Sequence, residues 1–244
     1  MKLNELALIG VATATVVSCA PAKNEYASYE LYPVRSGSLT EMEYTPEVTN
    51  FTLWAPTADE VRLMLFDAGD GGHAYETVSM VSDKEGTWTA KVEKDLIGKF
   101  YTFNVKIKDK WLGDTPGINA KVVGVNGKRA AIIDMRATDP EGWAQDKRPA
   151  LASPADAVIY EMHHRDFSID PSSGIQHKGK FLALTEEGTL SPEKLATGID
   201  HLKELGVTHV HILPSYDYAS VDETKLDENK YNWGYDPQNY NVPD

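Results

Sequence analysis

Between Tyr44 and about Arg136, apolar and polar residues alternate in short runs. The runs that predict strands are Phe51–Trp54, Val61–Phe66, Trp88–Val92, Tyr101–Ile107 and Ala130–Ile133. Because successive side chains of a strand point to opposite faces, a spacing of two places one face of each run inward. Glycine-rich or charged segments at 68–72 and 84–86 separate the runs and predict hairpins. We therefore expect an all-β, immunoglobulin-like sandwich over residues 44–136.

The period of the pattern changes in the second half of the chain. Ala157–His163 is a mostly apolar run, which predicts a strand buried on both faces. Ser191 and Pro192 are typical of a helix start, apolar residues then recur at helical spacing, and Gly206 is typical of a helix end. Val207–Leu213 predicts a second strand. A strand, a helix and a strand in this order predict a right-handed unit whose two strands are parallel neighbours.

This unit predicts the beginning of an α/β (β/α)₈ TIM barrel, with residues 137–244 as its amino-terminal part. The long polar loop from Ser215 to Tyr240 leaves the carboxyl end of the second strand, where the active face of such a barrel lies. A whole barrel takes about 250 residues. We therefore expect the barrel to be incomplete in this chain.

The first residues resemble a bacterial lipoprotein signal. Lys2 precedes an uncharged run from Leu6 to Val17, and small residues lead to Cys19, the one cysteine of the chain. The resemblance implies a signal peptide over residues 1–19, lipidation of Cys19, and a linker over 20–43. We expect export to the cell envelope with a lipid anchor in the outer membrane or at the cell surface, and membrane contact through that anchor alone. The alternative is an ordinary secretory peptide and a secreted protein.

Composition is that of a folded, water-exposed protein, with 41% hydrophobic and 25% charged residues. The formal net charge is −13. A surface of this sign repels a phosphate backbone, which argues against nucleic acid as a partner.

Several motifs together resemble type I pullulanases, which belong to glycoside hydrolase family 13 in the α-amylase superfamily. The motifs begin at Phe51 (FTLWAPTA), Asn126 (NGKR), Pro140 (PEGW), Val158 (VIYEMHHRDFS), His177 (HKGKF) and Tyr231 (YNWGYDP). The last is the most specific, since it separates pullulanases from isoamylases and branching enzymes. The resemblance implies that the sandwich is a family 48 carbohydrate-binding module and that the catalytic barrel begins at Val158.

The family hydrolyses α-1,6 branch linkages in pullulan, amylopectin and related α-glucans, with retention. This chemistry needs a carboxylate nucleophile and a carboxylic acid about 5–5.5 Å apart. In the family the catalytic acids lie on barrel strands four, five and seven, which we do not find in this sequence. We therefore assign no catalytic residue, and expect a fragment of a larger enzyme that is inactive alone. Calcium is common in the superfamily, but we assign no ligand for it, no other metal and no cofactor.

The resemblance carries over to one binding residue, Tyr235, which matches the tyrosine that stacks on the glucose ring beside the scissile bond. Trp233 and Asp236 are flanking candidates for binding an α-glucan. The alternative is that these aromatic side chains pack the loop onto the barrel, and that Asp236 is present because Asp-Pro forms turns.

Histidines support one rival class of enzyme. His209 and His211 share a strand face, as metal ligands of amidohydrolases do, although we expect them to be buried structural residues. Glu161, His163 and Arg165 also share a face. They either satisfy one another by hydrogen bonds and salt bridges or line the floor of a sugar site.

Two further alternatives concern the whole chain. One is a non-catalytic α-glucan-binding lipoprotein that ends at Asp244, and the other is an isoamylase-like debranching or branching enzyme. A natural end at Asp244 would leave strand faces and a sheet edge uncovered, so we expect such a protein to need a partner that covers them. Trp54, Trp88 and Trp111 are candidate sugar platforms in the sandwich. We expect Trp54 to belong to the core and Trp111 to be exposed.

Overall fold

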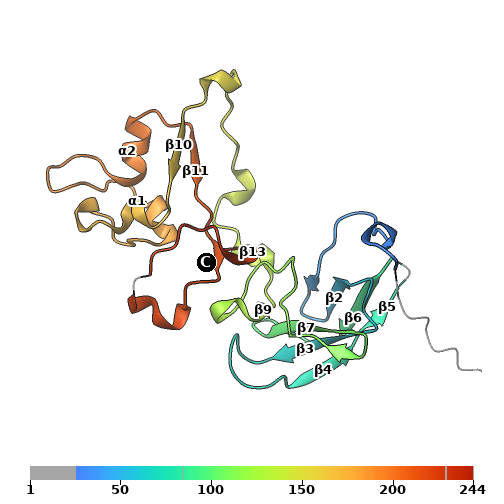
Figure 1. Ribbon diagram of the computed structural model, residues 1–244. Coiled ribbons are helices and arrows are strands. Elements are labelled where there is room, and N and C mark those ends of the chain that lie inside the picture. The colour runs from blue at the N-terminus through green and yellow to red at the C-terminus, as the bar shows by residue number, and fades with distance from the viewer. Residues whose placement is uncertain (1–25, 84, 229, 244) are drawn as a thin grey trace, which may run out of the picture.

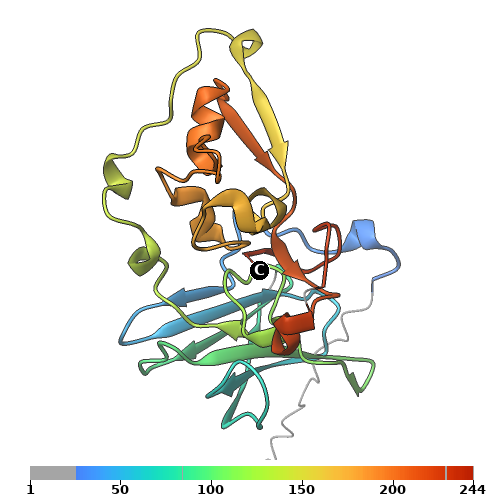
Figure 2. The same cartoon turned by 90° about the vertical axis from the view of Figure 1, so that its left-hand side faces the viewer.

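The structure is a computed structural model that describes residues 26–83, 85–228 and 230–243 (Figure 1). The predicted signal segment and Cys19 lie outside the described residues. The chain forms two lobes, a β-sandwich and a smaller lobe with few helices (Figures 1 and 2). In both views residues 137–155 run as an extended segment from the sandwich to the far end of the smaller lobe.

Two antiparallel sheets build the sandwich, as the alternating runs predicted. One sheet has the order β1 (Met42–Tyr44), β2 (Thr49–Trp54), β6 (Thr87–Val92), β5 (Val81–Ser82). The other has the order β4 (Glu76–Ser79), β3 (Glu60–Phe66), β7 (Phe100–Ile107), β8 (Lys110–Trp111), and β9 (Ala130–Ala131) also pairs with β7. The hairpins predicted at 68–72 and 84–86 connect β3 to β4 and β5 to β6.

The sandwich core consists of alternate residues of facing strands. Phe51 on β2, Leu63 on β3 and Phe103 on β7 are each fully buried. The Tyr101 ring lies edge-on between the other aromatic rings, with centroid distances of 5.1 Å to Phe51 and 5.5 Å to Phe103. Because aromatic rings bury the largest apolar areas and prefer this edge-to-face geometry, these three rings join the two sheets.

The tryptophans of the sandwich differ in burial. Trp88 is buried in the core. Trp54 is half-buried rather than a core residue, because its indole N–H reaches outward to the Pro33 carbonyl oxygen at 3.2 Å. Trp111 is also half-buried, because the Arg62 guanidinium lies over its ring, 3.9 Å from the centroid.

In the smaller lobe, β10 (Ile159–Met162) and β11 (His209–Ile212) pair in parallel, as predicted. Helix α2 (Gly198–Glu204) precedes β11, and β12 (Tyr216–Tyr218) pairs with β13 (Pro237–Pro243) in antiparallel fashion. Helix α1 (Asp166–Ile169) follows β10. The 3₁₀ turns are η1 (Tyr29–Leu31), η2 (Val125–Gly127), η3 (Met135–Thr138), η4 (Trp143–Gln145), η5 (Pro154–Asp156), η6 (Pro171–Ser173), η7 (Phe181–Thr185) and η8 (Glu223–Glu228).

The predicted start of the helix at Ser191 is wrong. Ser191 instead closes a turn, in which its N–H donates to the Leu195 carbonyl oxygen at 2.9 Å and Lys194 has a φ of 68°. The helix begins after Thr197, its N-cap. Ser-Pro initiates turns as well as helices, and here the turn closes the pair between Leu190 and Ala196.

The prediction that the strand over 157–163 is buried on both faces is also wrong. β10 keeps only Met162 buried, and all four residues of β11 are exposed. His209 and His211 are therefore exposed, contrary to expectation. Because successive residues of a strand point to opposite faces, the exposure of all four β11 residues means that neither face of this strand is buried by the described residues. Parallel pairing is confined, in the described residues, to β10 and β11.

None of the helices in the described ranges is both long and apolar enough to cross a membrane.

Candidate functional site

A hollow of about 330 Å³ lies at the carboxyl end of β10. It is lined by residues that directly follow this strand, by residues 178–181, and by the long loop after β11. We call residues 215–243 the aromatic loop. Side chains on the walls of the hollow include His163, His164, Lys180, Tyr218, Asp222 and Asn232.

His163 connects the end of β10 to the aromatic loop. Its Nε2 lies 2.7 Å from the Asn232 carbonyl oxygen, and its Nδ1 accepts from the Asp166 N–H at 3.3 Å. A neutral ring with the proton on Nε2 satisfies both contacts. The same ring stacks on Tyr231, with centroids 5.2 Å apart. His163 therefore holds the backbone of the YNWGYDP motif by a hydrogen bond and a ring stack.

The neighbouring His164, which also follows the end of β10, contacts a different part of the lobe. It is buried, and its ring lies 4.4 Å from that of Phe181. Burial lowers the pKa of His164, so the ring is neutral at physiological pH.

Glu161 on β10 and Arg165, which follows this strand, have separate partners. The Glu161 carboxylate lies 3.1 Å from His211 Nδ1, and the Arg165 guanidinium lies 3.1 Å from Asp166. Glu161 lies on β10, whereas His163 and Arg165 follow the end of this strand, so the shared strand face predicted for the three residues does not extend to them. The contacts described for them are mainly with residues outside the trio.

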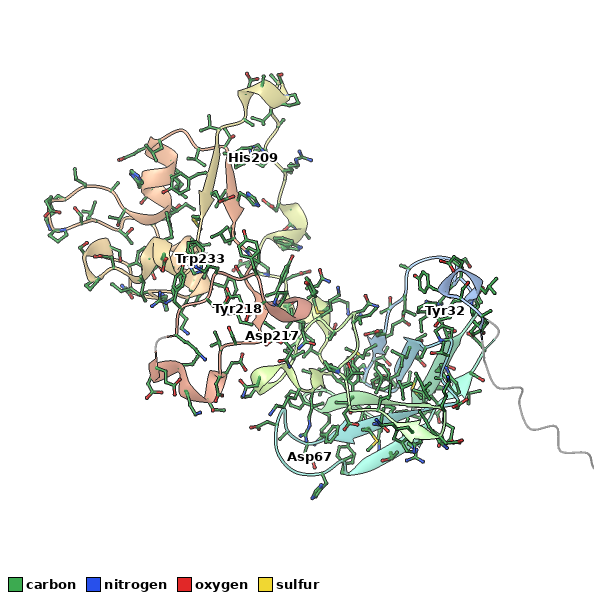
Figure 3. The ribbon with its side chains drawn as sticks, in the orientation of Figure 1. Tyr32, Asp67, His209, Asp217, Tyr218 and Trp233 are labelled. Carbon is green, nitrogen blue, oxygen red and sulfur yellow. The ribbon has the colours of Figure 1, made fainter. Side chains whose placement is uncertain are left out.

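The YNWGYDP motif presents its aromatic side chains to solvent. Exposed fractions are 42% for Tyr231, 63% for Trp233 and 69% for Tyr235. Tyr231 and Trp233 meet edge to face, with centroids 5.3 Å apart and planes at 89°. Figure 3 labels Trp233 in the smaller lobe. Large exposed rings of this kind commonly mark a binding surface.

Gly234 sets the conformation between these two exposed rings. Its φ is +91°, in the region that favours glycine, and a Cβ here would lie 1.9 Å from the Pro214 carbonyl oxygen. The backbone at Gly234 therefore packs directly against Pro214, just after β11.

Asp236 holds the two arms of the aromatic loop together. Its carboxylate accepts from the Ser220 N–H at 3.1 Å and from Asn232 Nδ2 at 2.7 Å. Hydrogen bonds from Ser220 and Asn232 lower the pKa of Asp236, so it is ionised at neutral pH. These contacts favour a role in the turn. The sequence analysis did not predict that His163 and Asn232 hold the aromatic loop by hydrogen bonds. The one feature of the sequence that marks them is that each lies in one of the family motifs.

No group of three or more His, Cys, Asp or Glu side chains in the described parts of the chain is placed to hold a metal ion. His209 and His211 therefore form no such group with a third His, Cys, Asp or Glu among these residues.

Comparison with known proteins agrees with this architecture. Residues 40–134 match the family model of carbohydrate-binding module 48, the isoamylase N-terminal domain. A pullulanase of Bacillus subtilis strain 168 is 39% identical over 202 residues, which cover 82% of this chain and 27% of that protein. Crystal structures of a pullulanase from Paenibacillus barengoltzii, which is 55% identical, align over 88% of this chain and 33% of that one. The TM-score is 0.84 for the apo form and 0.83 for the complex with maltohexaose and α-cyclodextrin.

The sandwich is thus a module of the family 48 carbohydrate-binding class. The chain as a whole belongs to the amino-terminal region of the pullulanases, in glycoside hydrolase family 13. It spans about a quarter of the B. subtilis protein and about a third of the P. barengoltzii chain.

Gly234→Ala is expected to loosen the aromatic loop, because the added methyl clashes with the Pro214 carbonyl and disfavours the positive φ. Strain of this kind costs about 1–3 kcal/mol. The measurement is the rate of limited proteolysis within residues 230–236. Gly113→Ala is the matched control, since its Cβ would meet no atom within 4 Å. Equal proteolysis rates in both variants and the wild type would contradict the account.

Proposed function

We propose that this chain is the glucan-binding amino-terminal region of a pullulanase-type glycoside hydrolase that cleaves α-1,6 linkages in pullulan, amylopectin and related α-glucans. The observation that carries the proposal is the pair of exposed rings, Trp233 and Tyr235, on either side of the packed Gly234. A pyranose ring has apolar C–H faces, and aromatic rings that are held in place bind such faces at little entropic cost.

Tyr235 is the proposed stacking residue. It is the more exposed of the two rings, at 69%. Trp233 is proposed as a second contact, because its ring is already supported edge-on by Tyr231. Asp236 acts indirectly, since its hydrogen bonds with Asn232 and Ser220 fix the segment 232–236, which contains Tyr235.

We also propose that residues 1–244 bind α-glucan without cleaving it. The family resemblance places the three catalytic acids on barrel strands beyond the two that this chain contributes. Retaining hydrolysis requires a pair of carboxyl groups flanking the scissile bond. The expected result is maltohexaose binding with no new reducing ends from pullulan.

Tyr235→Ala is expected to weaken maltohexaose binding by about tenfold, because one aromatic contact is worth about 1–1.5 kcal/mol. Isothermal titration calorimetry of the 244-residue chain measures the Kd. Tyr240→Ala is the matched control, since Tyr240 lies in the same loop with a similar exposure of 63%. The same loss of maltohexaose affinity in both variants, or no loss in either, would contradict the assignment of Tyr235 as a stacking residue.

For localisation we propose export and a lipid anchor at Cys19, on the strength of the signal-like first residues. Cys19→Ser is expected to abolish incorporation of labelled fatty acid into the protein. In a detergent phase-partition experiment, the variant is expected in the aqueous phase and the wild type in the detergent phase. A wild-type protein that stays aqueous and unlabelled in cells that process lipoproteins would refute the anchor.

A further inference from the structure

The η2 turn of the sandwich is hydrogen-bonded to the aromatic loop. Asn126, in η2, has a φ of 56° and directs its side-chain amide at the start of η8. Its Nδ2 donates to Asp222 at 3.0 Å, and its Oδ1 accepts from the Glu223 N–H at 2.8 Å. The Asn126 N–H in turn donates to the Glu223 carboxylate. Asn126 thus makes three hydrogen bonds with Asp222 and Glu223 of the smaller lobe.

The same turn contacts the far arm of the loop. Gln238 Nε2 donates to the Asn126 carbonyl oxygen at 2.9 Å, and Asn239 Nδ2 donates to the Gly127 carbonyl oxygen at 2.8 Å. Asn239 also donates to the Asp217 carboxylate at 2.6 Å, and Asp217 lies where the two lobes meet (Figure 3). Both strands at the base of the loop, β12 and β13, are therefore connected to η2.

Close approach requires glycine at the second position of the turn. Gly127 has a φ of 64°, and a Cβ there would lie 2.2 Å from Asp217 Oδ2 and 2.4 Å from Asn239 Nδ2. The Asn-Gly pair that begins the NGKR motif therefore has two distinct uses, hydrogen bonding by Asn126 and close packing by Gly127.

Arg129 holds the turn within the sandwich. Its guanidinium donates to the carbonyl oxygens of Ala68 at 2.7 Å and Gly72 at 3.2 Å, and it lies over the Phe66 ring, 3.7 Å from the centroid. The turn is thus a fixed part of the sandwich, and the aromatic loop is the part that it orders.

We infer that Asn126 is a positioning residue for the glucan site. It touches no residue of the YNWGYDP motif in its described contacts, yet it fixes Asp222 and Glu223, which line the hollow beside that motif. Through these contacts the sandwich controls the conformation of the loop that presents Trp233 and Tyr235. This inference deepens the proposed function and rests on it for the identity of the ligand.

Asn126→Gly isolates the side chain, because glycine keeps the left-handed backbone and removes only the amide. Lys108→Gly is the matched control, since Lys108 also has a positive φ of 49° and an exposed side chain, but lies at the β7–β8 turn. Asp222→Ala removes the partner on the loop side. Hydrogen–deuterium exchange of residues 216–243 and the Kd for maltohexaose are measured for each variant and for the double variant.

Asn126→Gly is expected to speed exchange in the aromatic loop and raise the Kd, each about tenfold, with the sandwich strands unchanged. Asp222→Ala is expected to do the same. The effect of the double variant should be smaller than the product of the two single effects, because both single variants break the same Asn126–Asp222 hydrogen bond. Lys108→Gly should match the wild type.

Three results would overturn the inference: wild-type loop exchange in Asn126→Gly, the same change in Lys108→Gly, or exchange that rises equally in the sandwich strands. If the wild type binds no maltohexaose, the proposed function fails. The exchange measurements still decide on their own whether Asn126 positions the loop.

Discussion

The burial of Val242 in the sandwich is the constraint on which the smaller lobe depends. Val242 lies near the end of β13, is 1% exposed, and belongs to the same apolar cluster as Phe51 and Phe103. The smaller lobe itself buries few apolar residues, namely Met162, Ile175, Ala183 and Leu202. Apolar burial is the main favourable term in folding, so the last strand is stabilised chiefly by a core that the first half of the chain builds.

From this constraint the arrangement of the site follows. With β13 fixed on the sandwich and paired with β12, the segment between them is closed at its base. The η2 turn and His163 then hold that segment from two sides. Rings carried on a closed and supported loop lose little conformational freedom on binding, which is how exposed aromatic side chains gain affinity. The carbohydrate-binding module is thus part of the scaffold of the candidate site.

The local pattern of apolar and polar residues predicted those strands whose formation depends on which face they bury. Alternation identified the sandwich strands Thr49–Trp54 and Phe100–Ile107, because one face of each packs in a core. It missed β4 and β5, which are short and mostly exposed. The predicted helix start at Ser191 was wrong, because serine is common both in turns and at the N-caps of helices. The predicted burial of β10 on both faces was wrong, because the hydrophobicity of a strand indicates what it can bury and not whether another element covers it.

The sequence predicted the aromatic residues of the candidate site but not the residues that hold their loop in place. Tyr235 and Trp233 stand in a recognisable run, whereas Asn126 lies 97 residues from its partner Glu223. No periodicity relates residues that far apart, and a hydrogen-bonding Asn before Gly is by itself a common turn. Only the fold brings the NGKR turn against the loop that carries the YNWGYDP motif.

The aromatic loop depends on the sandwich for its order. Fluorine NMR of protein labelled with 5-fluorotryptophan tests this dependence, because Trp88 reports the sandwich core and Trp233 the loop. In a urea titration the account predicts that the Trp233 signal reaches its unfolded position no later than the Trp88 signal. A native Trp233 signal that persists after Trp88 has unfolded would contradict it.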